Sequence, residues 1–172
     1  MLSHIAILME NQPGALSRVV GLFSQRGYNI DSLSVAPTQD PTLSRLTMTT
    51  SENPEIINQI LRQLYKLVDV VMVQNLSDAE AYSIELAIIK LVSSREKIEK
   101  IISQAKELEG KILDDKDDHI MFEIWGDSTD IDALLASLKE EEFLEVTRSG
   151  LLGMTKGNVA LNTNDQTKIS YD

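Results

Sequence analysis

The sequence predicts an α+β protein of two similar units, each a four-stranded antiparallel sheet with two helices on one face. Three observations lead to this prediction. Strand-like and helical apolar patterns follow the order strand, helix, strand, strand, helix, strand, and this order occurs twice. Helical stripes begin at Leu16 and Ile57, and again at Ile98 and Ile131. A short polar linker, Ser77–Ala81, separates the two series.

The first unit opens with a strand and a helix. Ser3–Met9 has apolar residues at alternating positions on both faces, which predicts a strand covered on both sides. A helix follows the loop Glu10–Gly14 and ends at Gly27, a residue type that favours helix C-termini. The apolar stripe of this helix consists of Leu16, Val19, Val20 and Phe23.

Two strands, a helix and a last strand complete the first unit. Tyr28–Pro37 and Leu43–Thr50 are strand-like and are joined by a turn at Asp40-Pro41. The next helix begins near Asn53-Pro54, a capping residue followed by proline at the first helical position. Val70–Val73 is the closing strand. This order, βαββαβ, is the ferredoxin-like arrangement.

The second unit repeats the order with different spacing. Its expected strands are residues 84–92, 111–115, 119–125 and 143–148. One helix carries the stripe from Ile98 and ends at Gly110, and the other is capped by Ser128 or Thr129. The chain distance between the first stripes differs from that between the second stripes, so the units share an architecture without being a tandem repeat. We therefore expect domains at 1–76 and 82–157, a linker at 77–81 and a poorly ordered polar tail at 158–172.

Composition and charge exclude several classes of protein. The 172 residues include no cysteine and two histidines, which excludes disulfides and cysteine nucleophiles and argues against a histidine-based metal cluster. A net charge of -11 and a pI of about 4.6 argue against nucleic acid as a partner. The sequence has no apolar run of about 18 residues and no signal-peptide pattern, so we expect a cytoplasmic protein that does not cross a membrane.

The stretch Asn11–Arg18 is the best candidate for a binding site. Gly14 allows another molecule to approach the backbone closely, and Pro13 pushes the preceding residue towards an extended conformation. The helix that starts there offers N–H groups without intrahelical partners, which suits a carboxylate such as that of an amino acid. An ordinary strand-to-helix turn is the alternative interpretation. At the far end of the helix, Asn29 begins a strand that would approach a partner's loop if two sheets paired edge to edge.

Residues Glu10–Leu33 resemble the ACT domain of the acetolactate synthase (acetohydroxyacid synthase) small-subunit family. The resemblance continues through Val35–Thr38, Asp40–Arg45 and Gln63–Val70, and Glu145–Gly150 resembles the closing motif of that family. It covers roughly residues 1–158 and is most specific in the first 75.

The resemblance implies a regulatory subunit, not an enzyme in its own right, in branched-chain amino-acid biosynthesis. Family members activate a thiamine-diphosphate-dependent catalytic subunit and make it sensitive to feedback inhibition by valine. The chain would form a homodimer through its ACT domains and would itself hold no cofactor. Its partner, the catalytic subunit, would carry thiamine diphosphate, Mg²⁺ and FAD.

The resemblance also places the effector, valine, at the interface between two ACT domains. The residues concerned are Asn11, Gly14, Ala15 and Leu16 of one chain and Asn29 and Ile30 of the other. Backbone amides near Gly14 and Ala15 would hold the carboxylate, and the side chain of Asn29 or a nearby carbonyl would accept from the ammonium group. No residue is expected to be catalytic or to bind a metal.

Other functions are compatible with the same fold. One is a free-standing amino-acid sensor that acts on a different protein partner. Another is a small hydrolase such as an acylphosphatase, which needs an arginine aimed into a phosphate-binding loop; Asn11–Leu16 has none, although Arg18 is near. Asp114–Asp118 is expected to be an exposed acidic turn, with a Mg²⁺ or Ca²⁺ site as the alternative. Trp125 is either a core anchor or an interface residue.

Overall fold

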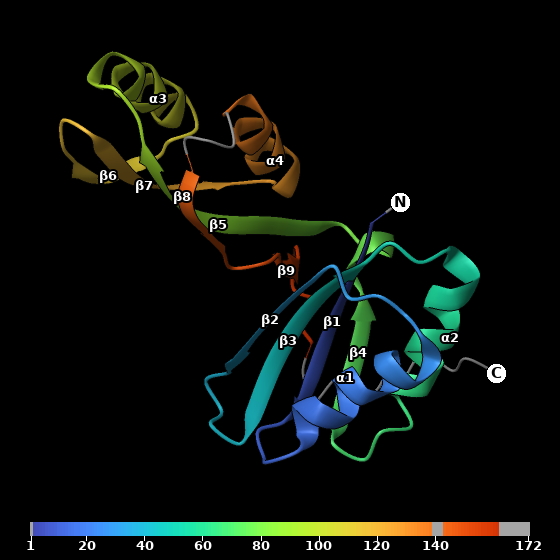
Figure 1. The fold of residues 1–172 in the computed structure, drawn as a ribbon. Coiled ribbons are helices and arrows are strands. Elements are labelled where there is room, and N and C mark those ends of the chain that lie inside the picture. Colours follow the sequence, from blue (N-terminus) through green and yellow to red (C-terminus); the bar gives the residue numbers. More distant parts are fainter. Residues whose placement is uncertain (1, 139–142, 162–172) are drawn as a thin grey trace. The chain divides into compact units, whose positions relative to one another are not determined.

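The computed structural model describes residues 2–138 and 143–161 and divides into two compact units (Figure 1). Of the described residues, unit 1 contains 2–82 together with 151–161, and unit 2 contains 83–138 and 143–150. We expected the second domain to extend to residue 157. Instead, the chain packs with unit 1 again from Leu151 onwards, so unit 2 is an insertion in unit 1. From residue 162 the expected polar tail lies outside the described residues.

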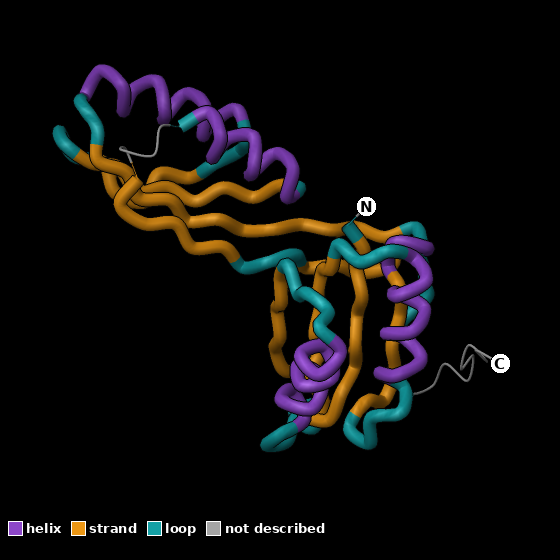
Figure 2. The backbone as a smooth tube through the Cα atoms, turned by 45° about the vertical axis from the view of Figure 1, so that its right-hand side comes forward, coloured by secondary structure: helices purple, strands orange, loops and turns teal. Residues whose placement is uncertain are grey.

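Unit 1 has the predicted ferredoxin-like topology. Its elements are β1 (Ser3–Glu10), α1 (Ala15–Arg26), β2 (Ser32–Pro37), β3 (Leu43–Thr50), α2 (Pro54–Leu64), β4 (Val70–Asn75) and a 3-10 turn, η1 (Leu76–Asp78). The sheet is antiparallel in the order β2-β3-β1-β4. Both helices lie on one face of this sheet (Figure 2). The strand β2 begins at Ser32 instead of Tyr28, because Tyr28 still donates its N–H to the Phe23 carbonyl at the end of α1 (3.0 Å).

The helices of unit 1 begin and end where local chemistry directs them. The side chain of Asn53 caps α2 by accepting from the Ile56 N–H at 3.0 Å, and Pro54 occupies the first turn. Gly27 ends α1 in the left-handed conformation (φ 70°). The apolar stripes of both helices pack against one face of the sheet. The core contains Ile5, Ile7, Val19, Phe23, Leu46, Met48, Ile57, Ile60 and Leu64.

The other face of the sheet in unit 1 is covered by residues 151–161, which we call the covering segment. This segment includes a strand that the sequence did not predict, β9 (Leu152–Thr155) (Figure 1, red). Arg45 donates from Nη2 to the Gly153 carbonyl at 2.7 Å, and a Cβ on Gly153 would lie 2.6 Å from the Leu76 side chain. Leu8, on this face of β1, is only 4% exposed, so the prediction that β1 is covered on both sides is confirmed.

Unit 2 repeats the arrangement. Its elements are β5 (Ala81–Val92), α3 (Arg95–Glu107), β6 (Lys111–Asp115), β7 (His119–Gly126), α4 (Ser128–Ser137) and β8 (Phe143–Arg148). The sheet order is β6-β7-β5-β8, and β9 pairs with β5, which starts in unit 1. Both helices of unit 2 cover one face of its sheet (Figure 2). The core contains Ile89, Leu91, Ile98, Ile101, Ile120, Phe122, Ile124, Ile131 and Leu134.

Two expected helix boundaries in unit 2 are wrong. The left-handed residue after α3 is Glu109 (φ 55°), not Gly110. Gly110 is needed for space instead, since a Cβ there would lie 2.6 Å from the Ala105 carbonyl oxygen. The N-cap of α4 is Asp127, whereas Ser128 is already helical and uses its hydroxyl elsewhere.

Trp125 belongs to the face of the second sheet that points away from α3 and α4. It lies opposite Leu86 in the β5–β7 register, and the alternate residue Ile124 faces the core. The side chain of Trp125 is 45% exposed, so Trp125 is not a core anchor. No helix in the described part of the chain is long and apolar enough to cross a membrane.

Candidate functional site

The candidate site begins at the N-terminus of α1. Gly14 precedes the helix in the left-handed conformation (φ 91°), which L-residues adopt only with strain. No side chain caps this helix, and its first turn has no acidic residue. This helix start is therefore open to an external anion.

The hydrogen bonds of the first turn show which amides are available. Arg18 donates its N–H to the Gly14 carbonyl at 3.0 Å, and Ala15 donates to the Gln12 carbonyl at 3.2 Å. Among the described residues no acceptor meets the N–H groups of Leu16 and Ser17. A carboxylate at this helix start would therefore find free N–H donors at Leu16 and Ser17, whereas the Ala15 N–H, expected to face the ligand, is bonded within the loop.

Asn11 lies next to this helix start at the end of β1. Its backbone N–H donates to the Thr42 carbonyl at 2.7 Å, and its Nδ2 donates to the Pro41 carbonyl at 2.9 Å. These bonds fix the exposed side chain against the β2–β3 hairpin. Its backbone N–H and Nδ2 are therefore engaged, while Oδ1 has no partner among the described residues. Oδ1 is thus an available acceptor beside a helix start that offers donors.

A buried carboxylate supports the loop from beneath. Asp69 is only 2% exposed and binds the guanidinium of Arg18 through both oxygens, including a 2.9 Å bond from Nη2 to Oδ1. Gln12 donates from Nε2 to the same Asp69 oxygen at 2.7 Å and to Glu10 at 2.6 Å. Arg18 Nη1 lies 3.1 Å from where a Cβ on Gly14 would stand. The network therefore holds a guanidinium directly beside the glycine turn.

The electrostatics of this pair are mutual. The hydrogen bond from Arg18 is the main cause that lowers the pKa of the Asp69 carboxyl, and burial opposes it. The same bond to Asp69 raises the pKa of the Arg18 guanidinium. Both groups therefore stay charged near neutral pH, and the charge of Asp69 offsets that of Arg18. The Arg18–Asp69 pair therefore holds the loop before α1 in place and adds little net positive charge to it.

Asn29 and Ile30 lie at the opposite end of α1. The Asn29 side chain is exposed and donates to Asp31 at 2.7 Å, while its carbonyl accepts from the Thr50 hydroxyl at 2.7 Å. Ile30 packs partly buried against the core of unit 1. Helix α1 has 12 residues and spans about 18 Å. Within one chain, the structure therefore groups Asn11, Gly14, Ala15 and Leu16 but keeps Asn29 and Ile30 apart from them.

Sequence reasoning missed the supporting network of Gln12, Arg18 and Asp69. Arg18 was considered only as a residue near the loop, and Asp69 was not singled out. One signal was available, because an acidic residue flanked by Val68 and Val70 in a short turn is a candidate for a buried, paired carboxylate. Its partner was not visible, since Arg18 and Asp69 are far apart in the chain.

The acidic turn after β6 is engaged in ion pairs. Asp115 binds Arg95 at 2.5 Å, and His119 lies 2.7 Å from Asp118 and 3.2 Å from Asp114. Among the described residues no group of three or more histidine or acidic side chains could hold a metal ion. Asp114 and Asp115 are the last residues of β6 and Asp118 directly precedes β7, so this acidic stretch spans the β6–β7 connection.

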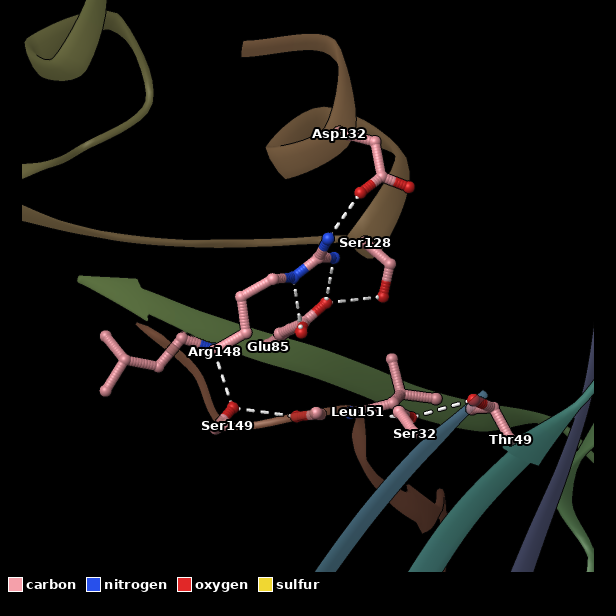
Figure 3. A network of polar contacts seen from close by, with 10 residues as sticks. Ser32, Thr49, Glu85, Ser128, Asp132, Arg148, Ser149 and Leu151 are labelled. Atoms are coloured by element: carbon pink, nitrogen blue, oxygen red, sulfur yellow. Dashed lines mark hydrogen bonds and ion pairs between the residues drawn. The ribbon is translucent and has the colours of Figure 1, made fainter. Parts of the chain in front are cut away.

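Unit 2 contains a second buried carboxylate. Glu85 on β5 is 3% exposed and receives two bonds from Arg148, from Nε at 2.9 Å and from Nη2 at 2.7 Å (Figure 3). The Ser128 hydroxyl donates to Glu85 at 2.8 Å, and Arg148 also donates to Asp132 at 2.6 Å. Burial by itself would raise the pKa of the Glu85 carboxyl, but these hydrogen bonds together outweigh it and lower that pKa. The cluster joins β5, β8 and α4.

Comparison with known proteins gives consistent matches along the chain. Residues 5–72 match the family model described as an AHAS small subunit-like ACT domain, and residues 84–157 match the model of the small subunit of acetolactate synthase. The chain is 43% identical over 155 residues to the acetolactate synthase isozyme 3 small subunit of Salmonella typhimurium, covering 90% of this chain and 95% of that protein. It is 44% identical to the acetolactate synthase small subunit of Haemophilus influenzae, with 89% and 94% covered.

A solved structure agrees with these sequence matches. The crystal structure of the acetolactate synthase small subunit from Thermotoga maritima superimposes with a TM-score of 0.82 at 31% identity. The superposition covers 92% of this chain and 99% of that one.

Proposed function

The chain belongs to the acetolactate synthase small-subunit family, and from this premise we propose that it binds valine and makes its catalytic subunit sensitive to feedback by that amino acid. The family places it in branched-chain amino-acid biosynthesis as a regulatory subunit. The catalytic subunit would carry thiamine diphosphate, Mg²⁺ and FAD, and this chain would activate it. The effector would be bound by residues of unit 1.

The observation that carries this proposal is the open start of α1. Two unpaired amides at Leu16 and Ser17, a left-handed glycine and no acidic residue in the first turn together favour a carboxylate. The Asn11 side-chain oxygen beside them is suited to an ammonium group. A zwitterion such as valine supplies both charges, and burying them is favourable only if each is hydrogen-bonded.

A dimer would complete the site. Asn29 and Ile30 lie about 18 Å from Gly14 along α1, so they reach the same ligand only if a second chain contributes them. The strand β2 is at the edge of the first sheet, and edge strands of two copies can pair. If the β2 strands of two chains paired antiparallel, the start of α1 in one chain would face the end of α1 in the other.

The test is isothermal titration of the purified chain with valine, using variants of Gly14. Gly14→Asp should weaken valine binding at least about tenfold, because its carboxylate repels that of the ligand. The new Cβ would stand 3.1 Å from Arg18 Nη1, so the aspartate would also form an ion pair with the Arg18 guanidinium beside the site. Gly14→Asn is the matched control, since asparagine tolerates the left-handed conformation and has no charge. Equal affinities of the parent and Gly14→Asp would show that valine does not bind here.

Reconstitution with a catalytic subunit separates this function from that of a free-standing amino-acid sensor. A regulatory subunit should raise the turnover of the catalytic subunit and make it sensitive to valine. A sensor for another partner would bind valine without changing that turnover.

A further inference from the structure

A cavity of about 610 Å³ lies in unit 1 on the face of the sheet opposite α1 and α2. Its floor is formed by Leu8 and Arg45, which are direct neighbours in the β1–β3 register. One wall is the turn between β2 and β3, and the other is the covering segment. The wall residues are Thr38, Gln39, Asp40, Leu43, Met154, Thr155 and residues 157–161. The volume is within the range of about 300–1,000 Å³ typical of small-molecule sites.

Arg45 is the positively charged group of this cavity. It is half-buried, and burial lowers the pKa of its guanidinium, although an arginine remains protonated in proteins. Its one described hydrogen bond is to the Gly153 carbonyl at 2.7 Å. By contrast, Arg18 and Arg148 bind buried carboxylates. Within residues 2–138 and 143–161 no carboxylate pairs with Arg45, so part of its five-donor fork is available.

The rest of the lining limits the ligand that fits. Leu8, Leu43 and Val159 provide an apolar surface for a short hydrocarbon group. Asp40 also lines the cavity, and hydrogen bonds from the Thr42 hydroxyl and N–H lower the pKa of its carboxyl. A charged Asp40 repels a second negative charge on a ligand. The cavity therefore favours a single negative charge over phosphate or a dicarboxylate.

We propose that this cavity is a second ligand site, which binds a small aliphatic monocarboxylate with its carboxylate on Arg45 and its hydrocarbon part on Leu8, Leu43 and Val159. This site lies on the opposite face of the sheet from the helix start at Gly14. It does not depend on the valine site, and neither Gly14 nor Asn29 contributes to it.

The test uses the full chain with isotope-labelled methyl groups, titrated with isovalerate and followed by NMR. Saturable shifts are expected at the methyl groups of Leu43, Met154 and Val159, while inorganic phosphate and succinate should leave them unchanged. Shifts confined to Leu16 and Ile30, or no saturable shift of the cavity methyl groups, would overturn the proposal. This measurement needs no variant, so it stands even if substitution of Arg45 disturbs the fold.

Variants of Arg45 then test the role of the guanidinium. Arg45→Gln should weaken isovalerate binding at least about tenfold, as expected for the loss of a charge-assisted hydrogen bond. Arg45→Lys retains the charge and should recover part of the affinity. Arg62→Gln, on the exposed surface of α2, is the matched control and should bind as the parent does. Unchanged affinity in Arg45→Gln would exclude Arg45 as the carboxylate ligand and overturn the proposal.

A last arm distinguishes this site from the proposed valine site. Gly14→Asp should weaken valine binding at least about tenfold and leave the isovalerate shifts at Leu43 and Val159 as they are in the parent. If Gly14→Asp removes the isovalerate shifts as well, both ligands use the helix start and the second site does not exist. If the parent binds isovalerate at the cavity and no valine anywhere, the cavity proposal holds while the proposed function fails.

Discussion

The two units have the same strand and helix order, and each contains a buried carboxylate held by an arginine, but these pairs support different structures. In unit 1 the arginine comes from the first turn of α1, and Asp69 holds it beside the Gly14 turn. In unit 2 the arginine comes from the closing strand β8, and Glu85 joins it to the start of α4. The first pair supports a loop beside an open helix start, and the second closes its unit.

The first helices of the two units, α1 and α3, also begin differently. Helix α1 starts after a left-handed glycine and has no acid in its first turn, whereas α3 starts after Ser94 in an extended conformation and has Glu96 in its first turn. An acidic side chain in this position occupies the positive end of the helix dipole itself. The two units therefore share an architecture, and local residues make the helix start in unit 1 the better candidate for binding a carboxylate.

The largest effect is expected from removing the arginine of unit 2. Arg148→Ala leaves Glu85 buried without its ion-pair partner, with the Ser128 hydroxyl and the Gly150 backbone N–H as its remaining hydrogen-bond donors. Breaking a fully buried ion pair costs about 3–5 kcal/mol, and we expect about 2–4 kcal/mol here because the Arg148 side chain is 32% exposed. The chain has a single tryptophan, Trp125 on β7, so its fluorescence during denaturant unfolding reports on unit 2.

A double variant sharpens this prediction. Glu85→Met with Arg148→Met removes both charges and should recover most of the lost stability, because no unpaired charge is left buried. If the single variant Arg148→Ala unfolds at the same denaturant concentration as the parent, the pair does not close unit 2 and the comparison of the two pairs fails.

A smaller effect is expected when α1 is given an acidic residue in its first turn, as α3 has. Ser17→Glu places a carboxylate at the third helical position of α1, where it favours the helix but competes with any ligand carboxylate. We expect valine affinity to fall at least about tenfold, with the stability of unit 1 unchanged or slightly higher. Titration calorimetry measures the first effect and circular dichroism the second. Glu96→Gln in α3 is the control and should leave valine binding unchanged.

The smallest predicted effect concerns pH and unit 2. The hydrogen bond to Asp118, and then that to Asp114, raises the pKa of His119 above its ordinary value. The stabilisation from protonated His119 is therefore fully present below the ordinary value of 6.5 and is lost as the pH rises through the raised value. His119→Asn should destabilise unit 2 slightly at about pH 6 and have no effect at about pH 9. An equal effect at both pH values, measured by Trp125 fluorescence, would contradict this prediction.

Much of the fold follows from local signals in the sequence. Leu43–Thr50 and Phe143–Arg148 have the predicted bounds, and Asn53-Pro54 and Gly27 mark helix ends as expected. The covering segment was missed because β9 has only four residues, too few to establish an alternating pattern, and its position depends on the return of the chain to unit 1. The role of Gly110 after α3 was also predicted wrongly. A side chain at this position would clash with its neighbours, and the left-handed conformation belongs to Glu109 instead.

The candidate site was predictable only where it depends on local sequence signals. Pro13-Gly14 before an apolar stripe indicates a glycine turn at a helix start, and the structure has that turn. The Arg18–Asp69 pair depends on two residues brought together only by the tertiary fold, so no local pattern indicates it. Which amides remain free was also not predictable, since it depends on the bond from Ala15 to the Gln12 carbonyl.

The insertion of unit 2 within unit 1 has a consequence for the order in which the protein is made. The strands β1–β4 are synthesised first, and the covering segment is synthesised only after all of Ser83–Gly150. During synthesis, the face of the first sheet that carries Ala6 and Leu8 is therefore without its cover, while unit 2, contiguous in the chain, can close first. A nascent chain halted after Gly150 would therefore expose this sheet face, whereas the released chain would cover it.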